Sequence, residues 1–169
     1  NKAELKATER NKDWILDLVS PQARATIRIN SDLDEQGIEV NADYLSLDKP
    51  SEPEISATSD DENNALLAAT SEEDESPYNI DPITLPPIYF YCQSCGVHGI
   101  DLGEITLDVA KEEDGLAIRQ LLVKSDETNI TATGYWKHAG GEVKSALNGT
   151  LTSPDVGQML KEYGVESGI

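Results

Sequence analysis

The chain has 169 residues, of which 13 are Lys or Arg and 32 are Asp or Glu, so its formal net charge is −19. This length predicts one domain, or a fragment of a larger protein, with enough chain to form a core. The charge excludes a general nucleic-acid binder and argues against docking on anionic lipid headgroups through a polybasic patch, because both need a basic surface. With 38% hydrophobic residues, the chain is expected to fold.

The chain begins at Asn1 rather than Met, and we interpret it as a piece of a longer protein. No apolar run approaches the roughly 18 residues of a membrane-spanning helix, and no signal peptide is recognisable. Any membrane anchor or export signal is therefore expected outside these residues.

Taken in chain order, the first half predicts strands in which apolar and polar residues alternate with a period of two. Alternating segments lie at 13–18, 23–30 and 38–43, and residues 3–9 form a less regular further strand. The turn Asp34-Glu35-Gln36-Gly37 joins two of them into a predicted hairpin.

An acidic segment follows. Residues 48–81 contain 11 acidic residues and one lysine, whereas the other 135 residues contain 21 acidic and 12 basic ones. The segment is rich in Ser, Glu, Asp and Pro and lacks alternation, which predicts a solvated insert or linker. We therefore expect a first β segment at 1–47, an acidic insert at 48–82 and a second β segment at 83–169. A tolerated loop insertion is the favoured interpretation, and an acidic contact arm for a partner is the alternative.

The second half predicts a meander with strands at 88–92, 105–109, 116–123, 128–137 and 143–151. The alternation changes phase between Ile118 and Leu121, which indicates a β-bulge. Ser153, Pro154 and Gly164 are typical of the two ends of a helix, predicted at 154–163 with one apolar stripe. The predicted fold is mainly β: an antiparallel sheet of about eight strands, with one apolar and one polar face, and a short amphipathic helix.

Cys92-Gln93-Ser94-Cys95 is the only motif with reactive potential, and it has three interpretations. A thioredoxin-like pair needs a helix N-terminus, whereas this motif ends an aromatic strand. A zinc site could use His98, but the only other histidine is His138 and no further cysteine exists. A structural disulfide would close a very small loop and needs an oxidising compartment; in a reducing one, the cysteines would be two small apolar residues. No other catalytic, cofactor or metal motif is recognisable.

The order of motifs in the second half resembles the YhdP family, AsmA-like proteins of Gram-negative envelopes. The shared features are Leu-Pro-Pro before a strand, the Cys-x-x-Cys, and a series of short sequences in fixed order: Leu102-Gly103, Asp114-Gly115, Gly134-Tyr135-Trp136 and a short helix after Leu151-Thr152-Ser153. The resemblance covers residues 83–169 best and residues 1–47 more loosely.

The resemblance implies a segment of a long periplasmic protein that is anchored in the inner membrane and supports the outer-membrane barrier. Such proteins resemble chorein-type lipid bridges, in which a curled β-sheet carries phospholipid acyl chains along an apolar groove towards the outer membrane. It also implies that the Cys92–Cys95 pair is a periplasmic disulfide. Phospholipid acyl chains are then the expected partner, and neither enzymatic activity nor a cofactor is implied. The other function considered is a structural or partner-binding periplasmic β-domain that uses the acidic insert as its contact.

About eight strands would provide a groove of about 40 Å, enough for one module of such a conduit. The residues expected to line it are Ile88, Phe90, Ile105, Leu107, Val109, Ile118 and Leu147. The competing interpretation of these residues is an ordinary hydrophobic core beneath the C-terminal helix.

Overall fold

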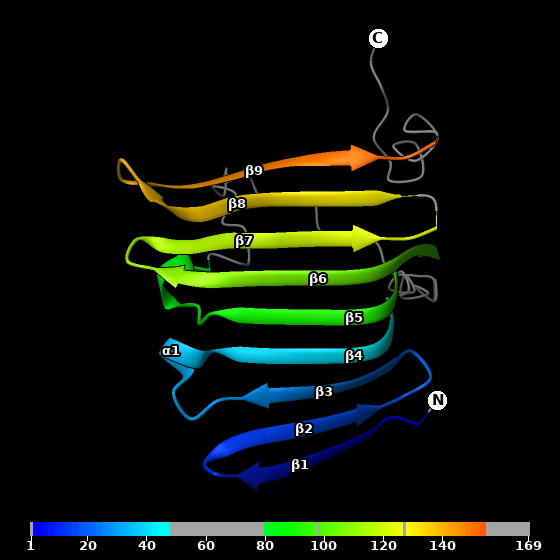
Figure 1. Ribbon diagram of the computed structural model, residues 1–169. Coiled ribbons are helices and arrows are strands. Elements are labelled where there is room, and N and C mark those ends of the chain that lie inside the picture. The colour runs from blue at the N-terminus through cyan, green and yellow to red at the C-terminus, as the bar shows by residue number, and fades with distance from the viewer. Residues whose placement is uncertain (1, 48–79, 98, 127, 155–169) are drawn as a thin grey trace, which may run out of the picture.

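Nine β-strands pair side by side in the order in which they occur along the chain (Figure 1). The computed structural model describes residues 2–47, 80–97, 99–126 and 128–154. The strands are β1 (Glu4–Arg10), β2 (Asp13–Val19), β3 (Ala23–Ile29), β4 (Ile38–Leu47), β5 (Ile88–Val97), β6 (Ile100–Glu112), β7 (Gly115–Lys124), β8 (Asn129–Ala139) and β9 (Glu142–Thr152). The other elements in the described ranges are one helical turn, α1 (Leu33–Gln36), and the short 3-10 helix η1 (Pro82–Thr84).

The predicted strands are confirmed. The less regular segment at 3–9 forms β1, so the sheet has nine strands rather than about eight. Two expectations about the sheet were wrong. The sheet is open and not strongly curled (Figure 1). The sequence did not indicate this, because alternation determines only which face is apolar, whereas curvature depends on twist and bulges. Moreover, β4 and β5 run parallel, while every other neighbouring pair is antiparallel. The 40 residues between these two strands exceed the dozen or so that a parallel connection requires.

The acidic insert up to residue 79 and nearly all of the predicted helix 154–163 lie outside the described residues.

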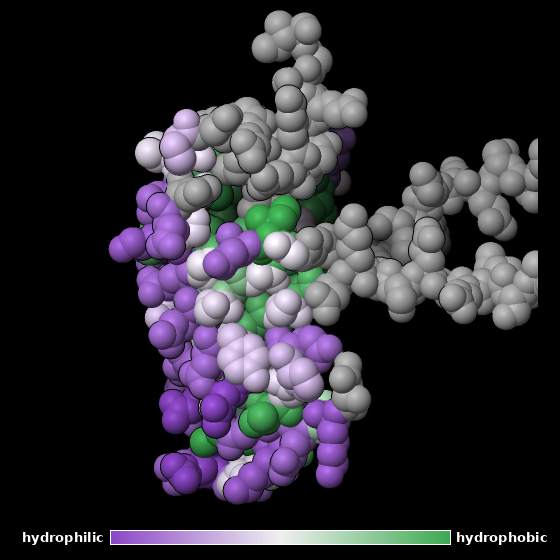
Figure 2. All heavy atoms as spheres, turned by 90° about the vertical axis from the view of Figure 1, so that its right-hand side faces the viewer, coloured by the Kyte–Doolittle hydropathy of each residue, from purple (hydrophilic) through white to green (hydrophobic). Residues whose placement is uncertain are grey.

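Alternation along each strand gives the sheet two chemically different faces. Direct cross-strand partners point to the same face. One continuous row of such partners crosses all nine strands and is apolar nearly throughout: Ala7, Leu16, Ile27, Val40, Phe90, Leu107, Leu121, Ala132 and Gly149. The row beside it on the opposite face is mainly polar: Lys6, Asp17, Thr26, Asn41, Tyr91, Thr106, Leu122, Thr131 and Thr150. Seen from the strand ends, one side of the sheet is hydrophilic, and hydrophobic residues lie towards the other (Figure 2).

A bulge in β7 keeps the second half of the sheet in phase. Val109 of β6 pairs with Ile118, whereas Leu107 pairs with Leu121, so β7 contains one residue more than its neighbour in this interval. The same shift occurs against β8. The extra residue puts both Ile118 and Leu121 on the apolar face, which confirms the bulge predicted from the change of phase.

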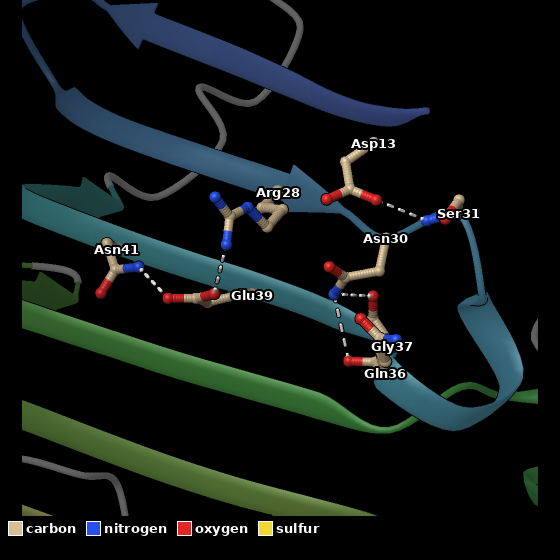
Figure 3. Close-up of polar contacts among 8 residues, drawn as sticks. All are labelled: Asp13, Arg28, Asn30, Ser31, Gln36, Gly37, Glu39 and Asn41. Atoms are coloured by element: carbon tan, nitrogen blue, oxygen red, sulfur yellow. Dashed lines mark hydrogen bonds and ion pairs between the residues drawn. The ribbon is translucent and has the colours of Figure 1, made fainter. Parts of the chain in front are cut away.

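The polar face and the β3–β4 turn are held by side-chain hydrogen bonds and ion pairs (Figure 3). Arg28 and Glu39 pair across β3 and β4 at 4.0 Å, and Asn41 donates to the same Glu39 carboxylate at 2.9 Å. At the turn, the Asn30 amide donates to the backbone carbonyls of Gln36 and Gly37, at 3.2 and 2.9 Å. The Asn30 contacts tie the end of the loop that contains α1 to the end of β3.

Candidate functional site: the apolar face

All seven residues predicted to line a groove lie on one face of the sheet. Four of them form a single cross-strand row, in which Ile88 pairs with Val109, Val109 with Ile118, and Ile118 with Gly134, whose other partner is Leu147. Phe90 and Leu107 pair directly in the next row, and Ile105 pairs with Cys92 in the row beyond it. We call this surface the apolar face; contact of its residues with lipid stays a prediction.

The apolar face is larger than predicted, because the first four strands continue the same rows. The prediction selected residues of the second half only, although the alternation of the first half contained the same signal. Among the large side chains that it missed are Trp14, Leu16, Leu18, Ile27, Ile29 and Val40 from β2 to β4, and Leu116, Leu121, Val123, Ile130 and Trp136 from β7 and β8.

Exposure on this face is unusually high for a folded domain. Leu5 is 61% exposed, Trp14 48% and Leu147 56%, and most other large side chains of the face are half-buried. The buried residues are mostly small, such as Ala42, Cys92 and Ala132. Within the ranges that the structure describes, no second sheet or long helix packs on the face, because α1 and η1 are the only elements outside the sheet. A surface of this kind is able to hold a long apolar ligand.

Cys92 and Cys95 lie in the floor of the apolar face. Their Sγ atoms are 2.07 Å apart, the bonding distance of a disulfide, and the two residues are 0% and 4% exposed. A bulge makes this pairing possible: Cys92 and Cys95 are three positions apart on β5, whereas their partners Ile105 and Gly103 are only two positions apart on β6. Both cysteines therefore point to the apolar face. Their partners on β4, Ala42 and Leu45, point to the same face. Phe90, Leu102 and Ile105 pack against this cluster.

The geometry disfavours the redox and zinc interpretations of the motif. The cysteines lie within β5, between two paired strands, and not at a helix N-terminus that would lower the pKa of a thiol. Among the residues that can be described, no cluster of three or more His, Cys, Asp or Glu side chains is arranged to hold a metal ion. His138 instead bonds to Asp81, and His98 lies outside the described residues.

A short segment crosses one end of the apolar face. Residues Ile80–Pro87, which we call the strap, contain η1, and η1 lies against β7 and β8. Asp81 holds the strap through a 2.9 Å hydrogen bond with His138 Nε2 and accepts the backbone N–H of Ile83 at 3.0 Å. The bond with His138, and secondly that with Ile83, hold the pKa of Asp81 below its ordinary value. At the other end of the strap, the Pro87 carbonyl accepts the N–H of Ile38 at 2.9 Å.

A comparison with protein families settles the relationship of the chain. The family model described as YhdP protein matches residues 1–169. The chain belongs to the YhdP family. The match includes residues 1–47, where the sequence motifs gave only a loose resemblance. No curated protein and no solved structure matches the chain.

Membership of the YhdP family implies a role in envelope phospholipid transport, since these are cell-envelope transport proteins rather than catalytic ones. Within the described residues, no helix is long and apolar enough to cross a membrane.

Proposed function

We propose that this chain is one segment of a periplasmic lipid conduit, in which acyl chains of phospholipid lie along the apolar face and move towards the outer membrane. The parent protein would be anchored in the inner membrane by a part outside these residues. No covalent chemistry is needed in this role, because transport requires only a continuous apolar surface for the acyl chains.

The single observation that carries this proposal is the exposure of an apolar surface that continues across nine strands. Each CH2 group removed from water contributes about 0.8 kcal/mol, so acyl chains gain substantially by lying on such a surface. At about 4.8 Å per strand, the eight intervals between nine strands give a path of about 38 Å. The opposite face has Thr, Asp, Asn and Arg side chains in the same strands, which confines lipid contact to one side.

The disulfide supports the expected compartment. Disulfides form and persist in oxidising environments such as the bacterial periplasm. The location of Cys92 and Cys95 in the floor of the apolar face also gives the pair a structural purpose, since it fixes the bulge in β5.

Two adjacent leucines provide a matched test. Leu121 points to the apolar face and Leu122 to the polar face, as their partners Leu107 and Thr106 show. We expect Leu121→Glu to reduce the phospholipid that copurifies with the parent protein by about ten-fold, because a carboxylate on the lipid path costs more than about 1.4 kcal/mol. Leu122→Glu, with the same change in charge and volume, should leave the lipid content near the wild-type value.

Extraction and mass spectrometry of bound lipid measure this directly, and the circular dichroism of both variants shows whether the sheet is intact. Equal lipid content in two folded variants, or wild-type protein that carries no phospholipid, would refute the proposed role.

A further inference from the structure

The two long sides of the apolar face, where the strands end, differ in structure. The strap-side rim consists of the strand ends at Ile38, Ile88, Glu112, Gly115 and Ala139, together with α1 and the strap. The opposite rim, which we call the open rim, consists of the strand ends at Leu47, Val97, Ile100, Lys124 and Asn129. In Figure 1, α1 marks the strap-side rim on the left, and the open rim lies on the right.

The strap covers the apolar face at the first of these rims. Pro82 of η1 is fully buried, and Leu116, which follows the first residue of β7, is only 4% exposed. His138, which holds Asp81, is on the apolar face, because it alternates along β8 with Gly134 and Trp136. The strap therefore covers the apolar face at this end of β7 and β8.

The strap-side rim is also strongly acidic. The basic residues Arg10 and Lys12 lie at one end of this rim, in the β1–β2 turn. Between β3 and β8, its turns and strand ends contain the carboxylates Asp32, Asp34, Glu35, Asp81, Glu112, Glu113 and Asp114. Lys111 and Lys137 lie among them, but their ammonium groups are already paired with Asp34 and Asp114. A phosphate group would be repelled from this rim at low and physiological ionic strength.

The open rim has a different character. Leu47, Val97 and Ile100 pair in one cross-strand row at the very end of β4, β5 and β6, and Leu47 is 50% exposed. The β2–β3 turn at this rim, Ser20-Pro21-Gln22, has no charged side chain, and the strand ends and turn from β6 to β8 have only Asp101, Lys124 and Asp126 among the described residues. From this rim, hydrophobic side chains are visible between polar ones (Figure 2). The two elements outside the sheet that the structure describes lie elsewhere: α1 precedes the start of β4 at the strap-side rim, and η1 lies against β7 and β8.

From this asymmetry we infer that phospholipid lies on the sheet in one orientation, with its phosphate headgroup at the open rim and the ends of its acyl chains directed at the strap. The inference rests on the proposed function. The space is adequate: β5 has 10 residues and is about 33 Å long, whereas one leaflet of acyl chains is about 15 Å deep. Acyl chains that enter at the open rim thus fit along the strands before they reach the strap.

Two photoactivatable phospholipids test this orientation in the full parent protein. Both are phosphatidylethanolamines; one has a diazirine at the end of an acyl chain and the other a diazirine on the headgroup. After illumination, mass spectrometry identifies the labelled peptides. The headgroup probe should label the peptides around Leu47, Val97 and Ile100 several-fold more than those around Leu116 and Trp136. The acyl probe should extend labelling to Leu116 and Trp136.

Headgroup labelling that is equal at the two rims, or stronger at Trp136, would overturn the orientation while leaving the proposed function intact. Failure of both probes to label any residue of the apolar face would overturn the proposed function as well. A surplus of unlabelled phosphatidylethanolamine should reduce the labelling by both probes.

Discussion

At the scale of single residues, Gly37 lies between α1 and β4 and is close to Pro87, the last residue of the strap. Its φ is +66°, and a Cβ atom there would lie 1.9 Å from the carbonyl oxygen of Pro87. Gly140, in the β8–β9 turn, has nearly the same φ of +68°, but a Cβ atom there would have no neighbouring atom within 4 Å. The two glycines therefore separate the cost of backbone conformation from the cost of a close contact.

We expect Gly140→Ala to lower the free energy of unfolding by about 1 kcal/mol, the cost of a left-handed conformation alone. Gly37→Ala should cost at least about 1 kcal/mol more, because Pro87 or the turn has to move. Urea unfolding of the two variants measures the difference. If both alanines cost the same, the close approach of Gly37 and Pro87 is incorrect.

Asp81 holds the strap through its hydrogen bonds with His138 and with the amide of Ile83. Its pKa is lowered from 3.8 chiefly by the hydrogen bond with His138. A lowered pKa in the folded state means that the stabilisation is fully present above the ordinary value and is lost as the pH falls through the lowered one. The Ile83 amide should therefore stay protected from hydrogen exchange down to about pH 4 and lose protection below it.

Hydrogen-exchange rates, corrected for their intrinsic pH dependence, check this at Ile83, with the amide of Leu107 in the sheet centre as the internal control. Asp81→Asn should lower the protection of Ile83 at neutral pH and remove the acid-dependent step. If that variant keeps the acid-dependent loss of protection at Ile83, a group other than Asp81 causes it.

At the scale of elements, the disulfide and the bulge of β5 form one unit. Cys92→Ala/Cys95→Ala should lower the free energy of unfolding by about 2 kcal/mol, the chain-entropy estimate for so short a loop. Reductant should destabilise the wild-type chain by a similar amount and have no effect on the double variant. Urea unfolding with and without reductant measures both. A wild-type chain that is insensitive to reductant would contradict the disulfide.

The elements also show how far the sequence determines this fold. Period-two alternation predicts the strands, and the change of phase at Ile118 and Leu121 predicts the bulge in β7, because a single extra residue moves every later side chain to the other face. The bulges in β4 and β5 were missed, since the predicted strands ended at residues 43 and 92, before the alternation resumes. The parallel pairing of β4 with β5 depends on the path of the connecting residues, which alternation within the strands does not determine.

At the scale of the whole molecule, the sequence predicted which residues share a face but neither the extent of that face nor the shape of the sheet. The seven residues predicted to line a groove were chosen by alternation in the second half of the chain, and cross-strand pairing brings them into adjacent rows. The contribution of β1 to β4 follows from the single continuous sheet, a property of pairing between distant segments. The strap could not be predicted from alternation, because η1 lies against β7 and β8 through contacts between residues far apart in the chain.

Photo-crosslinking in cells tests most directly whether phospholipid follows the apolar face. A photoactivatable amino acid is placed in the parent protein at Phe90 or Leu107 on this face, and at their neighbours Tyr89 or Asp108 on the polar face. We expect phospholipid to be captured at Phe90 and Leu107 and not at Tyr89 or Asp108. Capture at all four positions, or at none, in protein that is folded and functional would contradict transport along this face.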